Sequence, residues 1–233
     1  MAYDFASGLM WYEVFLCSTI CHEAAHAWTA LKLGDDTAAR GGQASLNPLP
    51  HIRREPFGMI VVPILSWLAG GWLIGWASAP YDPVWARTHP RRAAWMAMAG
   101  PASNLALAVL AGLCIRLGYE WHIFTSPITI GSDHLAVATL PGAADTVAKF
   151  LSIFVSLNLL LCAFNLIPLP PLDGSSAPLL LLPDRMVDGY MQFMRHPFLS
   201  YAGIFLASRL VGPILPKLLL GAASLLYPTV HYH

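Results

Sequence analysis

Residues 150–172 read FLSIFVSLNLLLCAFNLIPLPPL, a run of 23 positions without a charged side chain. Two more uncharged runs of 23 residues are Phe57–Ala79 and Ala93–Ile115. About 20 apolar residues are enough to cross the hydrocarbon core of a bilayer. Further apolar runs, from about residue 5 to 33 and from about 198 to 227, carry only a few charges. The pattern predicts an all-α, polytopic helical membrane protein with about five to six transmembrane or re-entrant segments.

The composition of the 233-residue chain supports this fold class. Only 11% of the residues are Asp, Glu, Lys or Arg, against about 25% in soluble proteins. The content of hydrophobic residues, 56%, excludes a disordered chain. The formal net charge of zero lacks the basic field on which nucleic-acid binding depends. No repeat, low-complexity tract or charged linker divides the sequence, so we expect a single membrane-embedded domain over 1–233.

Charged residues between the apolar runs are distributed unevenly. Lys and Arg lie in several of the segments between the apolar runs. Residues 117–146, by contrast, contain three acidic residues and neither Lys nor Arg. Cytoplasmic loops are enriched in Lys and Arg, so we expect residues 117–146 to lie outside. The run Phe57–Ala79 then has basic flanks on both sides. It is either a re-entrant hairpin, which its Pro63 and glycines allow, or a tilted span that is an exception to the rule.

An H-E-x-x-H pattern, His22-Glu23-Ala24-Ala25-His26, lies inside the first apolar run. Residues four apart share one face of a helix, so the imidazoles of His22 and His26 can bind one Zn²⁺ ion, with Glu23 at the edge of that face. A carboxylate beside zinc can take a proton from water that attacks a carbonyl. Ionisable groups inside a membrane usually mark a functional site. Hydrogen bonding within a helix bundle is the alternative for these side chains.

A catalytic zinc site takes three protein ligands and keeps a position for water, and Asp173 is a candidate for the third ligand. It lies in the segment 165–174, NLIPLPPLDG, where three prolines within four positions stop a helix. We expect irregular backbone at the cytoplasmic end of the run 150–172, on the side where His26 lies. For Asp173 alone, an aspartate in an interfacial loop is the alternative.

Together these motifs resemble the site-2 protease family of intramembrane zinc metalloproteases, in its compact prokaryotic branch without a PDZ or CBS domain. Residues 22–26 are similar to the family's zinc-binding motif, and residues 165–174 to its N-x-x-P-x(4)-D-G motif. Residues 99–104 (AGPASN) resemble its G-P-x-x-N element. Residues 46–52 (LNPLPHI) resemble a segment that the compact branch carries after the first helix. The four elements occur in the family's order and span most of the chain.

The resemblance implies a role for each matching residue. His22, His26 and Asp173 are expected to bind Zn²⁺, and Glu23 is expected to act as general base and later as proton donor. Two asparagines are candidate contacts to the substrate or to the tetrahedral intermediate, although an asparagine on an apolar helix can instead hydrogen-bond to another helix. These candidate substrate contacts are Asn104 and Asn165.

The resemblance also implies a small membrane-associated β-hairpin after the first helix, which would align an unwound substrate by strand addition. Residues 37–46, with Gly41 and Gly42, would form it. The sequence alone favours a plain loop, because glycine is poor in strands. One departure is the run Arg53-Arg54-Glu55 before Pro56, where the compact branch often reads D-P directly after the isoleucine.

The function expected from the sequence is an intramembrane zinc endopeptidase of a prokaryotic cytoplasmic membrane. It would hydrolyse membrane-anchored substrate proteins near the cytoplasmic face, in regulated intramembrane proteolysis. Its partners would be the substrate protein and the lipid bilayer. The alternative is a non-enzymatic membrane protein, a zinc-binding scaffold or a metal transporter, in which His22, Glu23 and His26 line an ion pathway.

Overall fold

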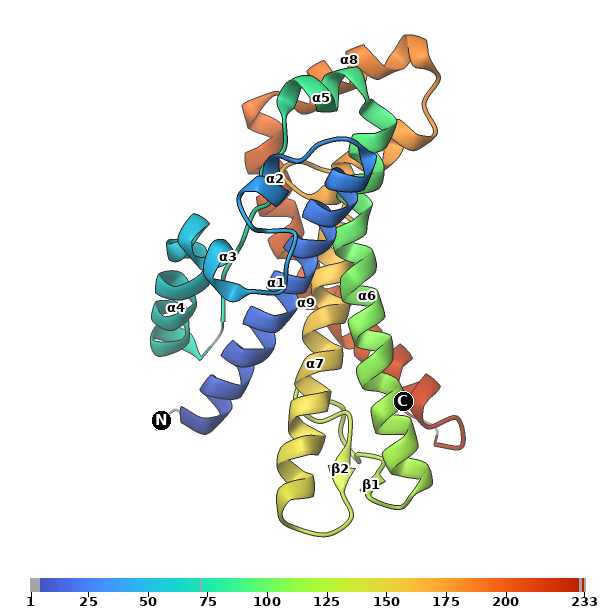
Figure 1. The fold of residues 1–233 in the computed structure, drawn as a ribbon. Coiled ribbons are helices and arrows are strands. Elements are labelled where there is room, and N and C mark those ends of the chain that lie inside the picture. The colour runs from blue at the N-terminus through green and yellow to red at the C-terminus, as the bar shows by residue number, and fades with distance from the viewer. Residues whose placement is uncertain (1–4, 72, 231, 233) are drawn as a thin grey trace. The chain divides into compact units, whose positions relative to one another are not determined.

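The computed structural model describes residues 5–71, 73–230 and 232, and it is mainly helical (Figure 1). Three described helices, α6, α7 and α9, are long and apolar enough to cross a membrane. The predicted class of a helical membrane protein is confirmed. In chain order the elements are α1 (Phe5–Leu33), α2 (Thr37–Arg40), α3 (Pro48–Arg54), the π-helix η1 (Phe57–Val61), α4 (Val62–Gly70), α5 (Pro83–Thr88), α6 (Pro90–Glu120), strands β1 (Phe124–Thr125) and β2 (Val137–Ala138), α7 (Ala143–Asn165), the 3-10 helix η2 (Asp173–Leu180), α8 (Asp184–Met194) and α9 (Pro197–Leu226).

The chain forms two compact units. The first consists of the residues up to Ser103 together with Asn165–Phe205, and the second of Asn104–Phe164 and the residues from Leu206 onward. Helices α6 and α9 each contribute residues to both units. The expectation of a single domain over 1–233 stays a prediction.

Helix α1 ends in a Schellman motif at Gly34. This glycine has a φ of +106°, a left-handed conformation that glycine adopts without steric cost. The amide of Asp35 donates to the carbonyl of Ala30 at 2.9 Å, and the amide of Gly34 donates to that of Leu31 at 3.3 Å. Both bonds satisfy carbonyls that the end of a helix leaves without partners.

The buried carboxylate of Asp35 joins the end of α1 to the residue before α5. It accepts hydrogen bonds from the hydroxyl and the amide of Thr37, and from the amide of Asp82 at 2.9 Å. Burial by itself would raise the pKa of the Asp35 carboxyl, but these hydrogen bonds outweigh it and hold that pKa below its usual value. The ionised carboxyl therefore stabilises this junction.

Residues 57–79 do not form one long helix. The π-helix η1 and helix α4 end at Gly71, which has a φ of +69°, and residues 73–82 contain neither helix nor strand. The returning chain meets the start of the first limb, because the amide of Trp76 donates to the carbonyl of Gly58 at 3.1 Å. A Cβ at Gly58 would lie 2.8 Å from the Trp76 ring. The structure therefore has the hairpin form, and the alternative of a continuous span is wrong.

Pro63 explains how this hairpin closes and docks. In η1 each amide bonds five residues back, as Val62 does to Phe57, and a proline has no amide hydrogen for the next bond, to Gly58. Trp76 supplies the missing donor. Pro63 also cannot donate to the carbonyl of Met59 four residues back, and this carbonyl accepts instead from the hydroxyl of Tyr12 on α1 at 3.0 Å.

The expected β-hairpin over residues 37–46 is wrong. Residues 37–40 form α2, and the chain then turns at Gly42, whose φ is +79°. Two alanines in this segment favour a helix, and the glycines that follow disfavour strands. The side chain of Gln43 reaches the carbonyl of Ser78 at 2.9 Å. The described strands lie elsewhere: β1 and β2 pair antiparallel, with Phe124 opposite Ala138.

In the second unit, α7 runs beside the later part of α6, and β1 and β2 lie near the ends of these helices (Figure 1). The segment before β2 is fixed from two sides. The hydroxyl of Ser152 accepts from the amides of Leu135 and Ala136 at 3.0 and 3.1 Å. The fully buried Tyr227 donates its hydroxyl to the carbonyl of Leu135 at 2.9 Å. Arg116 donates to the carbonyl of Leu226 at 2.8 Å, which satisfies an acceptor at the end of α9.

We expect Asp35→Asn to lower the free energy of unfolding by about 1–3 kcal/mol at neutral pH, because the amide cannot accept all of these hydrogen bonds. The contribution of the carboxylate is present above the usual pKa of an aspartate. It is lost as the pH falls through the depressed pKa of the folded state. The difference between wild type and variant should therefore shrink in acid.

Thermal unfolding in detergent at neutral and acidic pH measures this difference. Asp36→Asn is the matched control, since this neighbouring carboxylate is exposed and pairs only with the exposed Arg40 in the described structure. Equal loss of stability in the two variants would contradict the assignment.

Candidate metal centre

The H-E-x-x-H residues lie on a buried face of α1. His22, Glu23 and His26 are 7%, 6% and 5% exposed. The rings of His22 and His26 lie with centroids 4.6 Å apart and nearly perpendicular, at 81°. The helix thus brings both imidazoles to one side, as the spacing predicts.

Asp173 completes a triangle of ligand atoms with the two histidines. Its Oδ2 atom lies 3.0 Å from Nε2 of His22 and 3.3 Å from Nε2 of His26. The two Nε2 atoms are 2.9 Å apart. Tetrahedral bonds to zinc of about 2.0–2.1 Å would separate neighbouring ligand atoms by about 3.3–3.4 Å. The triangle therefore needs to open by only a few tenths of an ångström to hold an ion.

The tautomer of His26 supports a cation at this place. Its Nδ1 atom lies 2.8 Å from the carbonyl of Met96, which can only accept, so Nδ1 carries the proton and Nε2 presents a lone pair. If both imidazoles are neutral, Nε2 of His22 is the one atom of the triangle that can carry a proton. At most one proton is then shared by Nε2 of His22, Nε2 of His26 and Oδ2 of Asp173. The buried Oδ2 of Asp173 is left without a hydrogen-bond donor in the described structure. A divalent cation would satisfy all three atoms.

Position 100 of α6 must be glycine, because α6 passes close to the imidazoles of His22 and His26. A Cβ at this position would lie 2.5 Å from Nε2 of His22, and closer still to Nε2 of His26. No side chain fits there without displacing the rings. Since Met96 lies one turn earlier on α6, the same helix face both orients His26 and leaves room for the ligand triangle.

The irregular segment after α7 positions Asp173. Leu172 donates its amide to the carbonyl of Leu169 at 3.0 Å, and η2 begins at Asp173. A Cβ at Gly174 would meet the backbone of Ile167 and Leu166, so the chain can fold back only with glycine here. The predicted irregular backbone is confirmed, and the interfacial-loop alternative for Asp173 does not describe its contacts.

The donor set of two imidazoles and one carboxylate matches catalytic zinc sites, which leave a fourth position for water or substrate. Nitrogen and oxygen donors in this number suit zinc better than the oxygen-rich shells of calcium or magnesium. No other group of this kind occurs among the residues that the structure describes.

The two asparagines occupy different settings. Asn104 is fully buried in the second unit, where its Nδ2 donates to Oδ1 of Asn158 on α7 at 2.9 Å. Nδ2 of Asn158 in turn donates to the carbonyl of Phe154. The structure thus contains the hydrogen bond to another helix that was the alternative interpretation of Asn104. Asn165 is half-buried at the end of α7, in the first unit with Asp173.

Sequence reasoning missed three contributors in the first unit. The carbonyl of Met96 carries no sequence signal, because any residue provides it. Gly100 lies in the AGPASN motif, whose pattern gave no indication of the contact with the imidazoles. His51 lies in the LNPLPHI segment and is fully buried, but no role was assigned to it.

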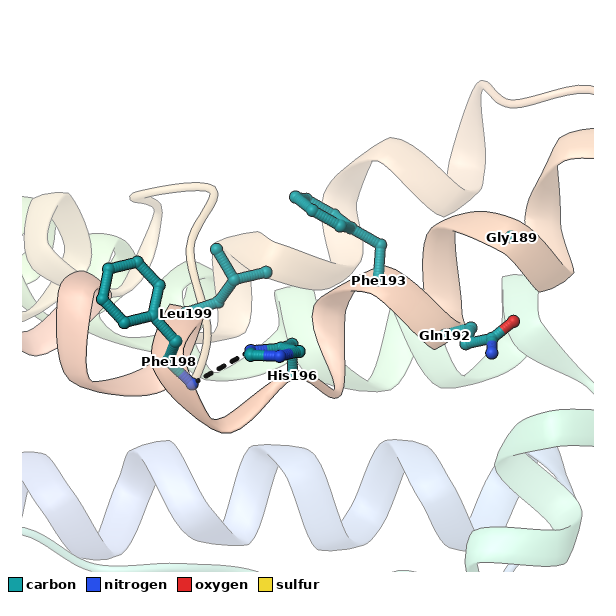
Figure 2. A pocket seen from close by; sticks show the side chains of 6 residues that line it. All are labelled: Gly189, Gln192, Phe193, His196, Phe198 and Leu199. Carbon is teal, nitrogen blue, oxygen red and sulfur yellow. Dashed lines mark hydrogen bonds between the residues drawn. The ribbon is translucent and has the colours of Figure 1, made fainter.

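A shallow pocket of about 510 Å³ lies apart from these residues, between α8 and the start of α9. Figure 2 shows its lining side chains and the hydrogen bond of 3.3 Å from the amide of Phe198 to Nδ1 of His196. None of the sequence-predicted site residues lines it. The lining residues are Gly189, Gln192, Phe193, His196, Phe198 and Leu199.

Comparison with known families agrees with this geometry. The model of peptidase family M50 matches residues 12–206, a range that contains the ligand triangle and both asparagines. The chain belongs to peptidase family M50. This is the site-2 protease family, so the resemblance stated from the motifs is confirmed.

Named relatives of this M50 chain come from three bacterial species, Bacillus subtilis, Mycolicibacterium smegmatis and Mycobacterium tuberculosis. The protein named "Putative zinc metalloprotease YwhC" of Bacillus subtilis is 36% identical over 160 residues, 68% of this chain and 63% of that protein. "Putative zinc metalloprotease Rip2" of Mycobacterium tuberculosis is 33% identical over 164 residues, 70% of this chain and 53% of that protein. The chain thus covers less than two thirds of the length of these relatives. No solved structure matches it.

We expect Gly100→Ala to lower the affinity for zinc by at least about 10-fold, because the added methyl group must displace the imidazoles. Zinc content after dialysis in a metal-buffered solution measures this loss, and His22→Ala gives the value for a missing ligand.

Gly112→Ala is the matched control on the same helix. There the new Cβ would make only an ordinary contact, 3.7 Å from Leu226. If Gly100→Ala retained as much zinc as this control, the close packing of α6 on the imidazoles would have no bearing on the metal.

Proposed function

We propose that this protein is an intramembrane zinc endopeptidase that hydrolyses membrane-anchored proteins near the cytoplasmic face. The observation that carries the proposal is the convergence of His22 and His26 of α1 with Asp173 of η2. The buried Glu23 lies on α1 beside the two histidines. Membership of peptidase family M50 supports the reaction class. The long apolar helices support the membrane setting.

In this proposal His22, His26 and Asp173 are the zinc ligands. Bound Zn²⁺ lowers the pKa of water and polarises a carbonyl group. Glu23 transfers the proton: its carboxylate accepts a proton from the attacking water, holds it, and gives it to the amine nitrogen as the peptide bond breaks. The burial of Glu23 shields this transfer from bulk solvent.

We assign the basic ends of the helices to the cytoplasm, in a prokaryotic cytoplasmic membrane, because cytoplasmic loops are rich in Lys and Arg. Arg91 and Arg92 at the start of α6 support this orientation. The metal group contacts the same part of α6, through Met96 and Gly100. The scissile bond would therefore lie toward that side.

Asn165 is the better supported of the two proposed substrate contacts. It is half-buried and lies in the same unit as Asp173. Asn104 is fully buried and already bonded to Asn158, so it would bind a substrate only after that pair opens.

The alternative of a metal transporter or zinc scaffold would use the same buried His22, Glu23 and His26. Membership of a peptidase family favours hydrolysis over transport. Zinc flux into liposomes that contain the protein would support the alternative.

We expect Glu23→Gln to lower the rate of cleavage at least about 100-fold, because the amide cannot accept the proton, while the zinc content stays near that of the wild type. Cleavage of a single-span model substrate in proteoliposomes, with zinc content measured in parallel, tests this. Glu13→Gln is the matched control, because Glu13 is an exposed carboxylate on the same helix. Normal cleavage by Glu23→Gln would exclude this residue as the base.

The membrane setting gives a second expectation, which concerns the substrate. A transmembrane helix hides its carbonyls in internal hydrogen bonds, so the scissile segment must unwind before hydrolysis. Glycine or proline introduced near the cytoplasmic end of the model substrate should raise kcat/KM several-fold, because these residues weaken the helix. Mass spectrometry of the products locates the cut. The same substitutions at the opposite end are the control, and equal effects at both ends would contradict cleavage near the cytoplasmic face.

A further inference from the structure

Asp173 lies in a tight turn over residues 172–175. The amide of Ser175 donates to the carbonyl of Leu172 at 3.0 Å, and this hydrogen bond encloses Asp173 and Gly174. On one side, Gly174 packs directly against the backbone of residues 166–167. The carboxylate of Asp173 keeps its place beside the two imidazoles only while this turn keeps its own.

A tyrosine of helix α8 holds the far end of the turn. The side chain of Tyr190 is half-buried, and its hydroxyl donates to the carbonyl of Ser175 at 2.5 Å. A carbonyl can only accept, so the tyrosine is the donor. Ser175 follows Asp173 by two residues. The hydrogen bond therefore ties the backbone that carries the third ligand to a different helix.

Helix α8 is itself fixed against the segments that surround the imidazoles. Its buried Val187, one turn before Tyr190, packs in one cluster with Leu179 of η2 and Ala94 of α6. Ala94 lies two residues before Met96, whose carbonyl orients His26. The apolar face of α8 thus rests on both η2 and α6, and Tyr190 acts from a helix with a defined position.

We infer that Tyr190 is a positioning residue for Asp173: its hydroxyl fixes the carbonyl of Ser175 and so holds the turn over residues 172–175 with the carboxylate aimed at His22 and His26. This inference rests on the proposed function, since it treats Asp173 as a zinc ligand. Tyr190 donates no ligand atom and acts through the backbone of the turn. A ligand that is held in place beforehand binds more tightly, because less freedom is lost on binding.

We expect Tyr190→Phe to lower the affinity for zinc by about 3- to 10-fold, because the ring keeps its packing while the hydrogen bond to Ser175 is lost. Titration of the metal-free protein in detergent against a competing chelator measures the affinity. Tyr201→Phe is the matched control, since Tyr201 is 75% exposed near the start of α9 in the same unit. An affinity of Tyr190→Phe equal to that of this control would overturn the inference.

A purely structural role of Tyr190 is separated by the Asp173→Ala background. If the hydroxyl acts through Asp173, Tyr190→Phe has no further effect on the weaker zinc affinity of Asp173→Ala, so the two losses are not additive. If Tyr190 only stabilises the unit in general, it lowers the affinity by the same factor in both backgrounds. Additive losses would overturn the inference.

A further measurement uses the metal-free protein and needs no activity. Hydrogen–deuterium exchange of the peptide that contains residues 172–180 should be faster in Tyr190→Phe than in the wild type and in Tyr201→Phe. Equal exchange in the three proteins would overturn the inference. Failure of the proposed function would look different: a wild-type protein that neither binds zinc nor cleaves the substrate, whatever the exchange of this peptide.

Discussion

Mutual repulsion among three buried electron-pair donors is the constraint on which the first unit depends. Nε2 of His22, Nε2 of His26 and Oδ2 of Asp173 lie within 3.3 Å of one another, and one ring already uses its proton on the carbonyl of Met96. Such a group is stable only with a cation or a shared proton between its members. Helix α6 must approach closely enough to orient His26, and for this reason it has no side chain at position 100.

Short-range spacing made much of this site predictable. The four-residue step from His22 to His26 places both rings on one helix face whatever surrounds the helix, and the prolines before Asp173 end α7 by local sterics. Contacts between segments that are far apart in the chain could not be predicted from the sequence. Nothing local marks Gly100 as the position that two imidazoles approach. Nothing in residues 46–52 shows that His51 is fully buried, with its Nε2 beside the carbonyl of Ser45.

Two expectations differ in outcome for physical reasons. The charge pattern did not distinguish a hairpin from a span for residues 57–79, because basic flanking residues do not show where a helix ends. In the structure the helix ends at Gly71, and the hydrogen bond from Trp76 to Gly58 closes a hairpin. The strands expected over residues 37–46 came from the resemblance alone, against the propensity of the local alanines and glycines. The partner of Asn104 was equally hidden, since Asn158 lies 54 positions away.

Pro63 lies where the hairpin closes on itself and where it contacts α1. Without an amide hydrogen, Pro63 can donate neither to Gly58, five residues back, nor to Met59, four residues back. These carbonyls accept from the amide of Trp76 and from the hydroxyl of Tyr12 on α1. Backbone acceptors away from water need such partners, so the loop closure through Trp76 and the contact with α1 through Tyr12 each satisfy one carbonyl. A residue with an amide hydrogen here could donate to one of these two carbonyls, where it would compete with Trp76 or with Tyr12.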